Sequence, residues 1–347
     1  MSGGTADDDE PPERLREELD SIRLARVRRV LGGLGLVALV GVLFGQALGT
    51  VDIFTENYTL AFFLESLGDF FPITYLGEIP FLDVGAYVEF IGERNLLFAS
   101  DISLLWTDPL RLVAEVSAVL RSDGLFALFG VAGNTLAVGF AGTVLGFPLA
   151  LLFGVLGSER VLPFPLNFVF RGTMSAIRAI PALVWILIYI PLAGITPVSA
   201  VLAVATDTIG NLGRLFTDEL EEIEEGPIEA METTGASRPQ TVTFGMLSQV
   251  TTPYIAWTLY IFEINVRIAV SLGVLGAGGL GQVVETQIGL FAFTNAMATL
   301  LCIFLLIISV ELFSQRTRSR LRSDTETRGL WELVVGFPRR FLESLAR

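Results

Sequence analysis

The sequence predicts an all-α polytopic membrane protein, and its composition and charge pattern support this fold class. The chain has 347 residues, of which 52% are hydrophobic and only 17% are charged. Charged residues are absent from long stretches, each with at least about the 20 mostly apolar residues that a helix needs to cross a bilayer. These stretches are residues 124–158, 179–206, 239–262 and 286–310, and residues 30–49 form a further apolar run.

Arginine clusters predict which ends of the apolar runs face the cytoplasm, because cytoplasmic loops are enriched in basic residues. Clusters precede the first run, follow the second and open the C-terminal tail; they comprise Arg23, Arg26, Arg28, Arg29, Arg160, Arg171, Arg316, Arg318, Arg320 and Arg322. Six spans, with both termini in the cytoplasm, place every cluster on that side of the plasma membrane. The expected spans are residues 30–49, 125–157, 173–192, 197–215, 251–273 and 289–311.

The same charge pattern divides the chain into five segments. They are a cytoplasmic acidic N-terminus (1–29), a first transmembrane anchor (30–49), an extracellular insertion (50–123), a transmembrane domain (124–315) and a cytoplasmic tail (316–347). The insertion holds twelve acidic residues and three arginines, which fits an outside loop. In the tail, Leu330, Trp331, Val334 and Phe337 recur at helical spacing, so the tail forms either an interfacial helix or a solvated chain.

Residue types that are missing from the chain argue against several functions. All 23 basic residues are arginine, and the net charge is −14. This acidic, lysine-free composition is typical of haloarchaeal-type proteins that function in high salt. With no histidine and the single Cys302, we expect no metal site, no cofactor and no catalytic residues. A phosphate-binding loop needs a lysine, so any ATP hydrolysis must come from another subunit.

One apolar run carries charged residues that are costly in a bilayer. Glu263 and Arg267 are four residues apart on one helical face, and such residues face the bundle interior or a wet cavity, usually as pairs. Asn265 and Asp207 are candidate additional partners. Either the two charges form a buried ion pair that fixes helix register, which we favour, or Arg267 lines a pathway and attracts an anion.

Glycines follow this charged stretch. Gly276, Gly278 and Gly281 form the pattern G-x-G-x-x-G, and Gly279 lies between them. A dinucleotide site would also need an acidic residue about 20 positions later, and none lies between Glu285 and Glu311. We therefore expect a sharp, closely packed turn at the outer end of the span.

The acidic loop at residues 217–240 predicts two helices separated by a glycine. Pro227 suits the first turn of a helix, and Gly235 suits the position after a helix, where φ is positive. The pattern E-A-x-x-x-x-G, with Glu229, Ala230 and Gly235, resembles the EAA motif of ABC importer permeases. The resemblance implies that this loop, with Ala236 and Arg238, docks into an ATPase subunit. The leucine–proline pair that usually follows the motif is replaced by Leu247-Ser248.

Other blocks resemble the phosphonate permease subunits of the same superfamily. They read ELEEIEEGPIEA, TGAS, FEINVR and LGVLGAGGLG, and the resemblance spans residues 125–315. It implies a six-span type I ABC importer permease of the MetI-like fold. It also implies an ABC ATPase, an extracellular solute-binding protein, a homodimer in membrane lipid, and no nucleic acid.

The expected function is therefore that of a permease subunit that imports phosphonate, or a phosphate- or phosphite-like oxyanion. The alternative is a stand-alone secondary transporter, with Glu263, Asp207 and Arg267 as its ion-coupling site. Transporters of that class typically contain inverted repeats of hydrophobic segments, and none is visible in the sequence.

Overall fold

The computed structural model describes residues 13–51, 60–76, 78–101 and 103–321. The acidic residues 1–12 and the expected interfacial helix of the tail lie outside the described residues. The chain divides into two compact units, Met1–Glu65 and Ser66–Arg347.

The first unit contains one long helix, α1 (Glu13–Thr50), and the start of α2 (Leu60–Phe70). Residues Ile22–Thr50 of α1 are apolar enough to cross a membrane, and none of the residues in its most apolar window is buried. A helix of this length that is apolar on every side suits a span surrounded by lipid. The anchor expected at residues 30–49 falls within this helix.

The second unit is mostly helical, with one short hairpin of antiparallel strands, β1 (Ile73–Leu76) and β2 (Ile79–Leu82). Its smaller helices and turns are α3 (Val84–Glu93), α4 (Leu104–Thr107), α5 (Pro109–Ser122), η1 (Phe126–Phe129), α10 (Gly226–Thr233), α11 (Arg238–Gln240), η2 (Thr241–Met246) and η3 (Gly273–Ala277). Its longer helices are α6 (Gly130–Gly157), α7 (Leu166–Arg178), α8 (Ala182–Ala193), α9 (Pro197–Glu221), α12 (Leu247–Leu272), α13 (Gly279–Gly289) and α14 (Phe293–Leu321).

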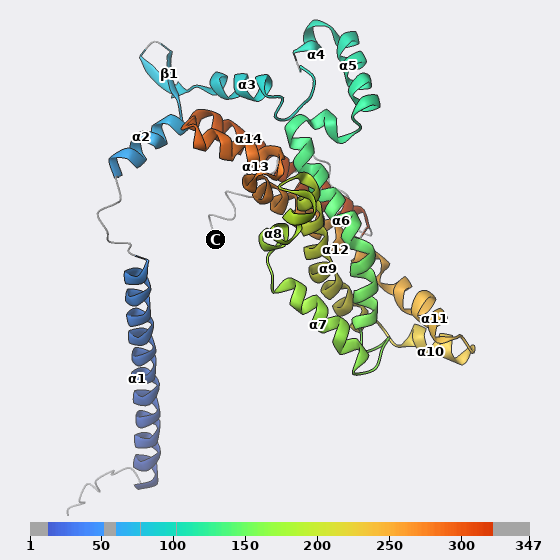
Figure 1. The fold of residues 1–347 in the computed structure, drawn as a ribbon. Coiled ribbons are helices and arrows are strands. Elements are labelled where there is room, and N and C mark those ends of the chain that lie inside the picture. Colours follow the sequence, from blue (N-terminus) through green and yellow to red (C-terminus); the bar gives the residue numbers. More distant parts are fainter. Residues whose placement is uncertain (1–12, 52–59, 77, 102, 322–347) are drawn as a thin grey trace, which may run out of the picture. The chain divides into compact units, whose positions relative to one another are not determined.

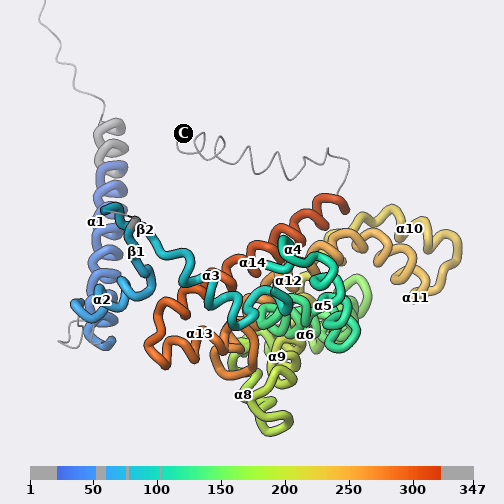
Figure 2. Tube along the Cα trace, turned by 90° about the horizontal axis from the view of Figure 1, so that it is seen from above, coloured from blue at the N-terminus to red at the C-terminus, as the bar shows by residue number. Residues whose placement is uncertain are grey.

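Helices α6, α9 and α12 form the centre of this unit. The hairpin of α10 and α11 projects from one end of the bundle, and α13 lies at the other (Figure 1, Figure 2). The long helices α12 and α14 connect the two ends. The α10–α11 hairpin, where the sequence predicts a partner to dock, therefore lies at the opposite end of the bundle from the glycine-rich turn.

Helices α6 and α9 pack closely because α6 carries a small residue at every fourth position. These residues are Gly142, Gly146, Ala150 and Gly154. A Cβ on Gly146 would lie 2.6 Å from the Ala205 carbonyl oxygen, and one on Gly154 would lie 2.7 Å from the Phe216 Cβ. A stripe of small residues is how membrane helices bring their backbones together, and here it fixes the register of α6 against α9.

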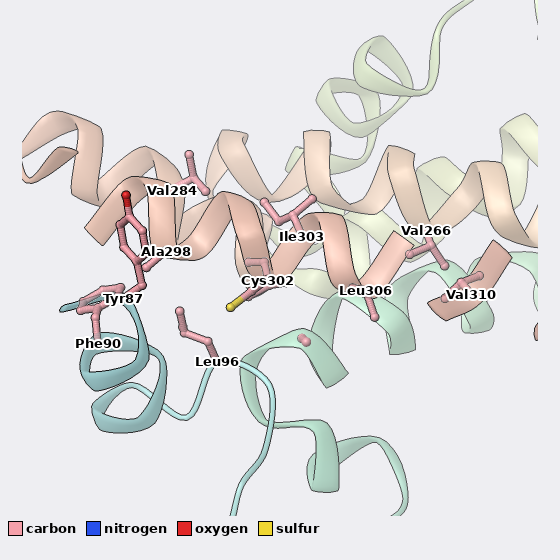
Figure 3. Close-up of a cluster of buried hydrophobic side chains, with 12 residues drawn as sticks. Tyr87, Phe90, Leu96, Val266, Val284, Ala298, Cys302, Ile303, Leu306 and Val310 are labelled. Carbon is pink, nitrogen blue, oxygen red and sulfur yellow. The ribbon is translucent and has the colours of Figure 1, made fainter. Parts of the chain in front are cut away.

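A segment before residue 124 also belongs to the core. Tyr87 and Phe90 of α3 and the following Leu96 are buried with Ala298 and Cys302 of α14 (Figure 3). Two backbone bonds extend the contact, since the N–H groups of Val131 and Ala132 donate to the carbonyls of Asn95 and Leu96 at 3.0 and 2.9 Å. The outside location of residues 50–123 stays a prediction.

The third expected span, at residues 173–192, is not a single straight helix. Helix α7 ends at Arg178 and α8 begins at Ala182, and their axes differ by 90°. The cause is Pro181, which has no N–H to donate and disfavours helical geometry in the residue before it. Its backbone is extended, with φ −60° and ψ 149°.

By length and composition, four described helices can cross a membrane, or five if the bent α7–α8 pair counts as one broken span. Six spans were expected from the sequence. The remaining expected span corresponds to α9, which carries Asp207 and Arg214 and is not among the apolar helices. Burial against α6 shields part of this polar helix, so its low hydropathy does not prevent it from lying inside the bundle.

Candidate functional site

The first candidate site is the hairpin formed by α10 and α11. Helix α10 ends at Thr233, and Gly235 follows with φ 79°. The Gly235 N–H donates to the Glu232 carbonyl at 3.0 Å, and the Ala236 N–H donates to the Met231 carbonyl at 3.2 Å. This pair of bonds is the Schellman motif that closes a helix, and its positive φ favours glycine.

The second arm of the hairpin is held by side-chain contacts. The Ser237 N–H donates to Oε1 of Gln240 at 2.8 Å, which caps α11. Nη2 of Arg238 donates to the Arg160 carbonyl at 2.8 Å, so α11 is attached to the loop between α6 and α7. From α11 the chain continues through the π-helical turn η2 into α12.

The two faces of α10 differ. Ile228 packs against the core that includes Phe216 and Met246, and Met231 is half-buried. Glu229 and Ala230 are exposed. The hairpin therefore has one face held by the bundle and a second face open to solvent.

Two arginines that the sequence suggested only as topology markers brace the base of this hairpin. Arg171 forms an ion pair with Glu221 at the end of α9, and its Nε donates to the Gly157 carbonyl at 2.7 Å. Nε of Arg160 donates to the Glu221 carbonyl at 3.0 Å. The two contacts to Glu221 join residues 50 and 61 positions apart, so no local pattern could have predicted them.

Glu263 and Arg267 form an ion pair, with Nη2 of Arg267 2.6 Å from Oε1 of Glu263. A second arginine, Arg318 of α14, lies 3.6 Å from Glu263, and Glu311 of α14 lies 3.6 Å from Arg267. The Glu263 side chain is 8% exposed, whereas that of Arg267 is 43% exposed. The pair thus belongs to a four-residue network between α12 and the charged end of α14.

Asp207 and Asn265 do not join this network, contrary to the sequence-based expectation. Nδ2 of Asn265 donates at 2.8 Å to both Thr143 of α6 and Thr208 of α9. Asp207 accepts a bond of 2.9 Å from Asn211 on its own helix. The physical reason is that position 265 is not in line with 263 and 267, since neighbouring residues on a helix point in different directions.

Asp207 and Asn265 instead line a cavity of about 500 Å³ between α7, α9 and α12. Its lining comprises Arg178, Asp207, Asn211, Arg214, Leu215, Asp218, Tyr260, Ile261, Ile264 and Asn265. Most of these side chains are polar, and the volume falls in the range of small-ligand sites. Arg267 does not line it.

The glycine-rich turn forms at the far end of α12. Gly276, Gly278 and Gly279 have φ values of 94°, 96° and 73°. A Cβ on Gly281 would overlap the Val270 carbonyl oxygen. The Leu280 N–H donates to Oγ1 of Thr135 on α6 at 3.0 Å, so the turn binds α13 to the start of α6.

One family model, described as the binding-protein-dependent transport system inner membrane component, matches residues 142–323. The chain belongs to this family. The matched range covers 182 of the 347 residues, counted from 142 to 323 inclusive. This inner membrane component region contains the α10–α11 hairpin, the cavity and the Glu263–Arg267 pair. Helices α1, α3 and α5 lie outside it.

Two permease proteins from other organisms are similar in sequence to this chain. The phosphate-import permease protein PhnE of Mycolicibacterium smegmatis is 33% identical over 195 residues, which cover 56% of this chain and 37% of that protein. The phosphite transport system permease protein PtxC of Stutzerimonas stutzeri is 29% identical over 190 residues, which cover 54% of this chain and 69% of that protein. The chain therefore spans little more than a third of the mycobacterial protein's length.

The chain also resembles a solved structure. An inward-facing form of the MetNI methionine ABC transporter aligns with a TM-score of 0.50 and 22% identity, over 57% of this chain and 94% of that chain. The likeness confirms the MetI-like fold that the sequence predicted.

Proposed function

We propose that the chain is the transmembrane permease subunit of an ABC importer that moves phosphonate, phosphate or phosphite across the plasma membrane. Membership of the inner membrane component family supports the permease role. The names of two relatives, a phosphate-import and a phosphite transport permease protein, support an oxyanion of phosphorus as the substrate.

The observation that carries this proposal is the exposed face of the α10–α11 hairpin. Its glycine-closed turn and the Arg238 bond to the α6–α7 loop hold it in one geometry at one end of the bundle. A separate ATPase subunit docks there, on the face that includes Glu229, Ala230 and Ala236. Because the hairpin continues into α12, movement at the dock is transmitted into the bundle.

The remaining parts of the transport system follow from the same assignment. Two copies of the chain form the pathway as a homodimer in membrane lipid, with both termini in the cytoplasm. A solute-binding protein delivers the substrate from outside, where residues 50–123 lie. The ATPase subunit hydrolyses the ATP, because the chain has no lysine for a phosphate-binding loop.

A pair of valine substitutions at neighbouring positions of the hairpin tests the docking. Gly235 has positive φ, whereas the exposed Thr234 has an ordinary φ of −80°. Gly235→Val should abolish co-purification of the ATPase subunit and uptake of the substrate, because a β-branched residue cannot hold this φ. Thr234→Val should retain both co-purification and uptake. Equal membrane yields of the two variants control for folding.

If the Gly235→Val chain still transports substrate with its ATPase bound, the hairpin is not the dock. A secondary transporter, the alternative, would continue uptake without any ATPase subunit.

A further inference from the structure

The cavity between α7, α9 and α12 contains a polar group that the proposed function has not used. Asn265 lies on the cavity wall and is completely buried, and its Oδ1 is a buried side-chain atom without a hydrogen-bond partner in the described chain. A buried acceptor without a hydrogen-bond partner is destabilising, because it has lost its bonds to water. A ligand that brings a hydrogen-bond donor to this wall would satisfy it.

The hydrogen bonds around Asn265 determine which way its amide points. The Thr143 hydroxyl donates to the Gly139 carbonyl at 2.7 Å, and the Thr208 hydroxyl donates to the Val204 carbonyl at 2.7 Å. Each hydroxyl has one hydrogen, so both threonine oxygens can only accept from Asn265. Nδ2 must therefore face the threonines, and Oδ1 must face away from them.

Five other polar side chains of the cavity form two arrangements, each with one positive and one negative charge. Nε of Arg178 donates to Oδ1 of Asn211 at 3.2 Å, and Nδ2 of Asn211 donates to Asp207 at 2.9 Å. Arg214 forms an ion pair with Asp218 at 2.9 Å. Two guanidinium groups can therefore donate to an anion, while the Asp207 carboxylate repels any oxyanion that has no hydrogen to place against it.

We infer that this cavity binds a singly protonated phosphorus oxyanion. Its anionic oxygens face Arg178 and Arg214, and its single P–OH hydrogen forms one three-centre bond shared by the acceptor oxygens of Asp207 and Asn265. This inference rests on the proposed function and specifies the protonated form of its substrate. No covalent bond changes, and the ligand leaves with the same proton.

Methylphosphonate and methanesulfonate are a matched pair of probes for this site. At mildly acidic pH both carry a single negative charge and have the same shape. They differ in that only methylphosphonate has an oxygen-bound hydrogen to donate. A site that recognises charge and size alone would bind them equally.

Protection of one cysteine measures binding at the cavity itself. Leu215 lines the cavity and has no charge, so Leu215→Cys is introduced into the full-length chain with Cys302→Ala and labelled with a maleimide in lipid nanodiscs. Methylphosphonate should slow the labelling at concentrations about 10- to 100-fold lower than methanesulfonate, as expected for a hydrogen bond to a charged group. Equal protection by the two anions, or protection by neither, overturns the inference.

Substitutions of Asp207 and Asn265 test whether these two acceptors cause the preference for methylphosphonate over methanesulfonate. Asp207→Asn supplies a donor in place of the carboxylate and should let methanesulfonate protect almost as well as methylphosphonate. Asn265→Leu should weaken protection by methylphosphonate about tenfold or more. Thr143→Val removes one bond to Nδ2 without changing Oδ1, so it should retain the selectivity. If Thr143→Val loses it as completely as Asn265→Leu, Asn265 has a structural role only.

Uptake by the assembled transporter separates this inference from the proposed function. Import of methylphosphonate by a complex whose cavity does not distinguish the two anions would reject the inference and retain the permease assignment. A complex that assembles with its ATPase but imports no phosphorus oxyanion would reject the assignment itself.

Discussion

Substitutions of the two arginines in one ion-pair network should change the free energy of unfolding non-additively. The network comprises Glu263, Arg267, Glu311 and Arg318. Glu263 is almost buried and lies between two arginines, at 2.6 Å from Arg267 and 3.6 Å from Arg318. Either arginine alone can still neutralise it when the other is removed. Arg267 is also 43% exposed, so solvent screens part of its interaction.

The magnitudes follow from this arrangement. Arg267→Met alone should lower the free energy of unfolding by no more than about 1 kcal/mol, because the Arg267 side chain is 43% exposed and Arg318 remains beside Glu263. Arg318→Met alone should have a similarly small effect. The double change leaves Glu263 buried without a cation and should cost roughly 3–5 kcal/mol, the usual penalty for a stranded buried charge. With single losses between zero and about 1 kcal/mol each, the coupling energy between the two arginines is then about 1–5 kcal/mol.

Denaturant unfolding of the purified chain in detergent micelles measures these three variants. Adding Glu263→Gln to the double variant should recover most of the lost stability, because no buried charge remains to be neutralised. Additive losses from the two arginine variants would refute the reasoning, as would a double variant as stable as the natural chain. A stable but inactive Arg267→Met would make Arg267 a pathway residue.

Three further predictions concern the turn, the hairpin anchor and the insertion. Gly281→Ala should destabilise the chain by roughly 1–3 kcal/mol in the same unfolding assay, because the added Cβ overlaps the Val270 carbonyl oxygen. Gly172→Ala is the control: its Cβ position has open space, so the free energy of unfolding should stay the same or rise slightly. Arg238→Gln should reduce transport-coupled ATP hydrolysis at unchanged membrane yield, because it loosens the bond to the Arg160 carbonyl; an unchanged rate would exclude this anchor. Trp106→Cys, at an 85% exposed position, should react with an impermeant maleimide in whole cells, and reaction only after lysis would place residues 50–123 inside.

Local signals in the sequence predicted the hairpin and the glycine turn well. Pro227 and Gly235 constrain their own backbone angles, and the structure places both where those angles are required. The glycines from 276 to 281 were predictable for the same reason. Three of them have positive φ, and Gly281 has no room for a Cβ, so glycine is required at each of these positions by itself. A four-residue spacing likewise sufficed to bring Glu263 to Arg267.

Features that depend on a second helix were harder to predict. The spacing of Glu263 and Arg267 shows that they share a face, but it does not show that α14 supplies Arg318 and Glu311. The apolar run around residue 180 reads as one span, although Pro181 turns the chain by 90°. Helix α9 is too polar to stand out from hydropathy alone, and its place in the bundle depends on the small-residue stripe of α6.

The cavity shows the same limit. Asp207 and Asn265 were selected from the sequence as polar residues inside expected spans, and both do line one cavity. Arg178 and Arg214 were not selected, although they lie inside the expected spans 173–192 and 197–215. Only the fold brings α7 and α9 together, and only the threonine bonds orient the Asn265 amide.

Uptake into proteoliposomes tests the central claim most directly. The purified chain is reconstituted with and without the ATPase subunit of its transport system, the solute-binding protein is added outside, and internal phosphonate is measured. The permease assignment predicts accumulation only when the ATPase subunit and ATP are both present. Accumulation by the chain alone, driven by an imposed ion gradient, would contradict it and establish a secondary transporter.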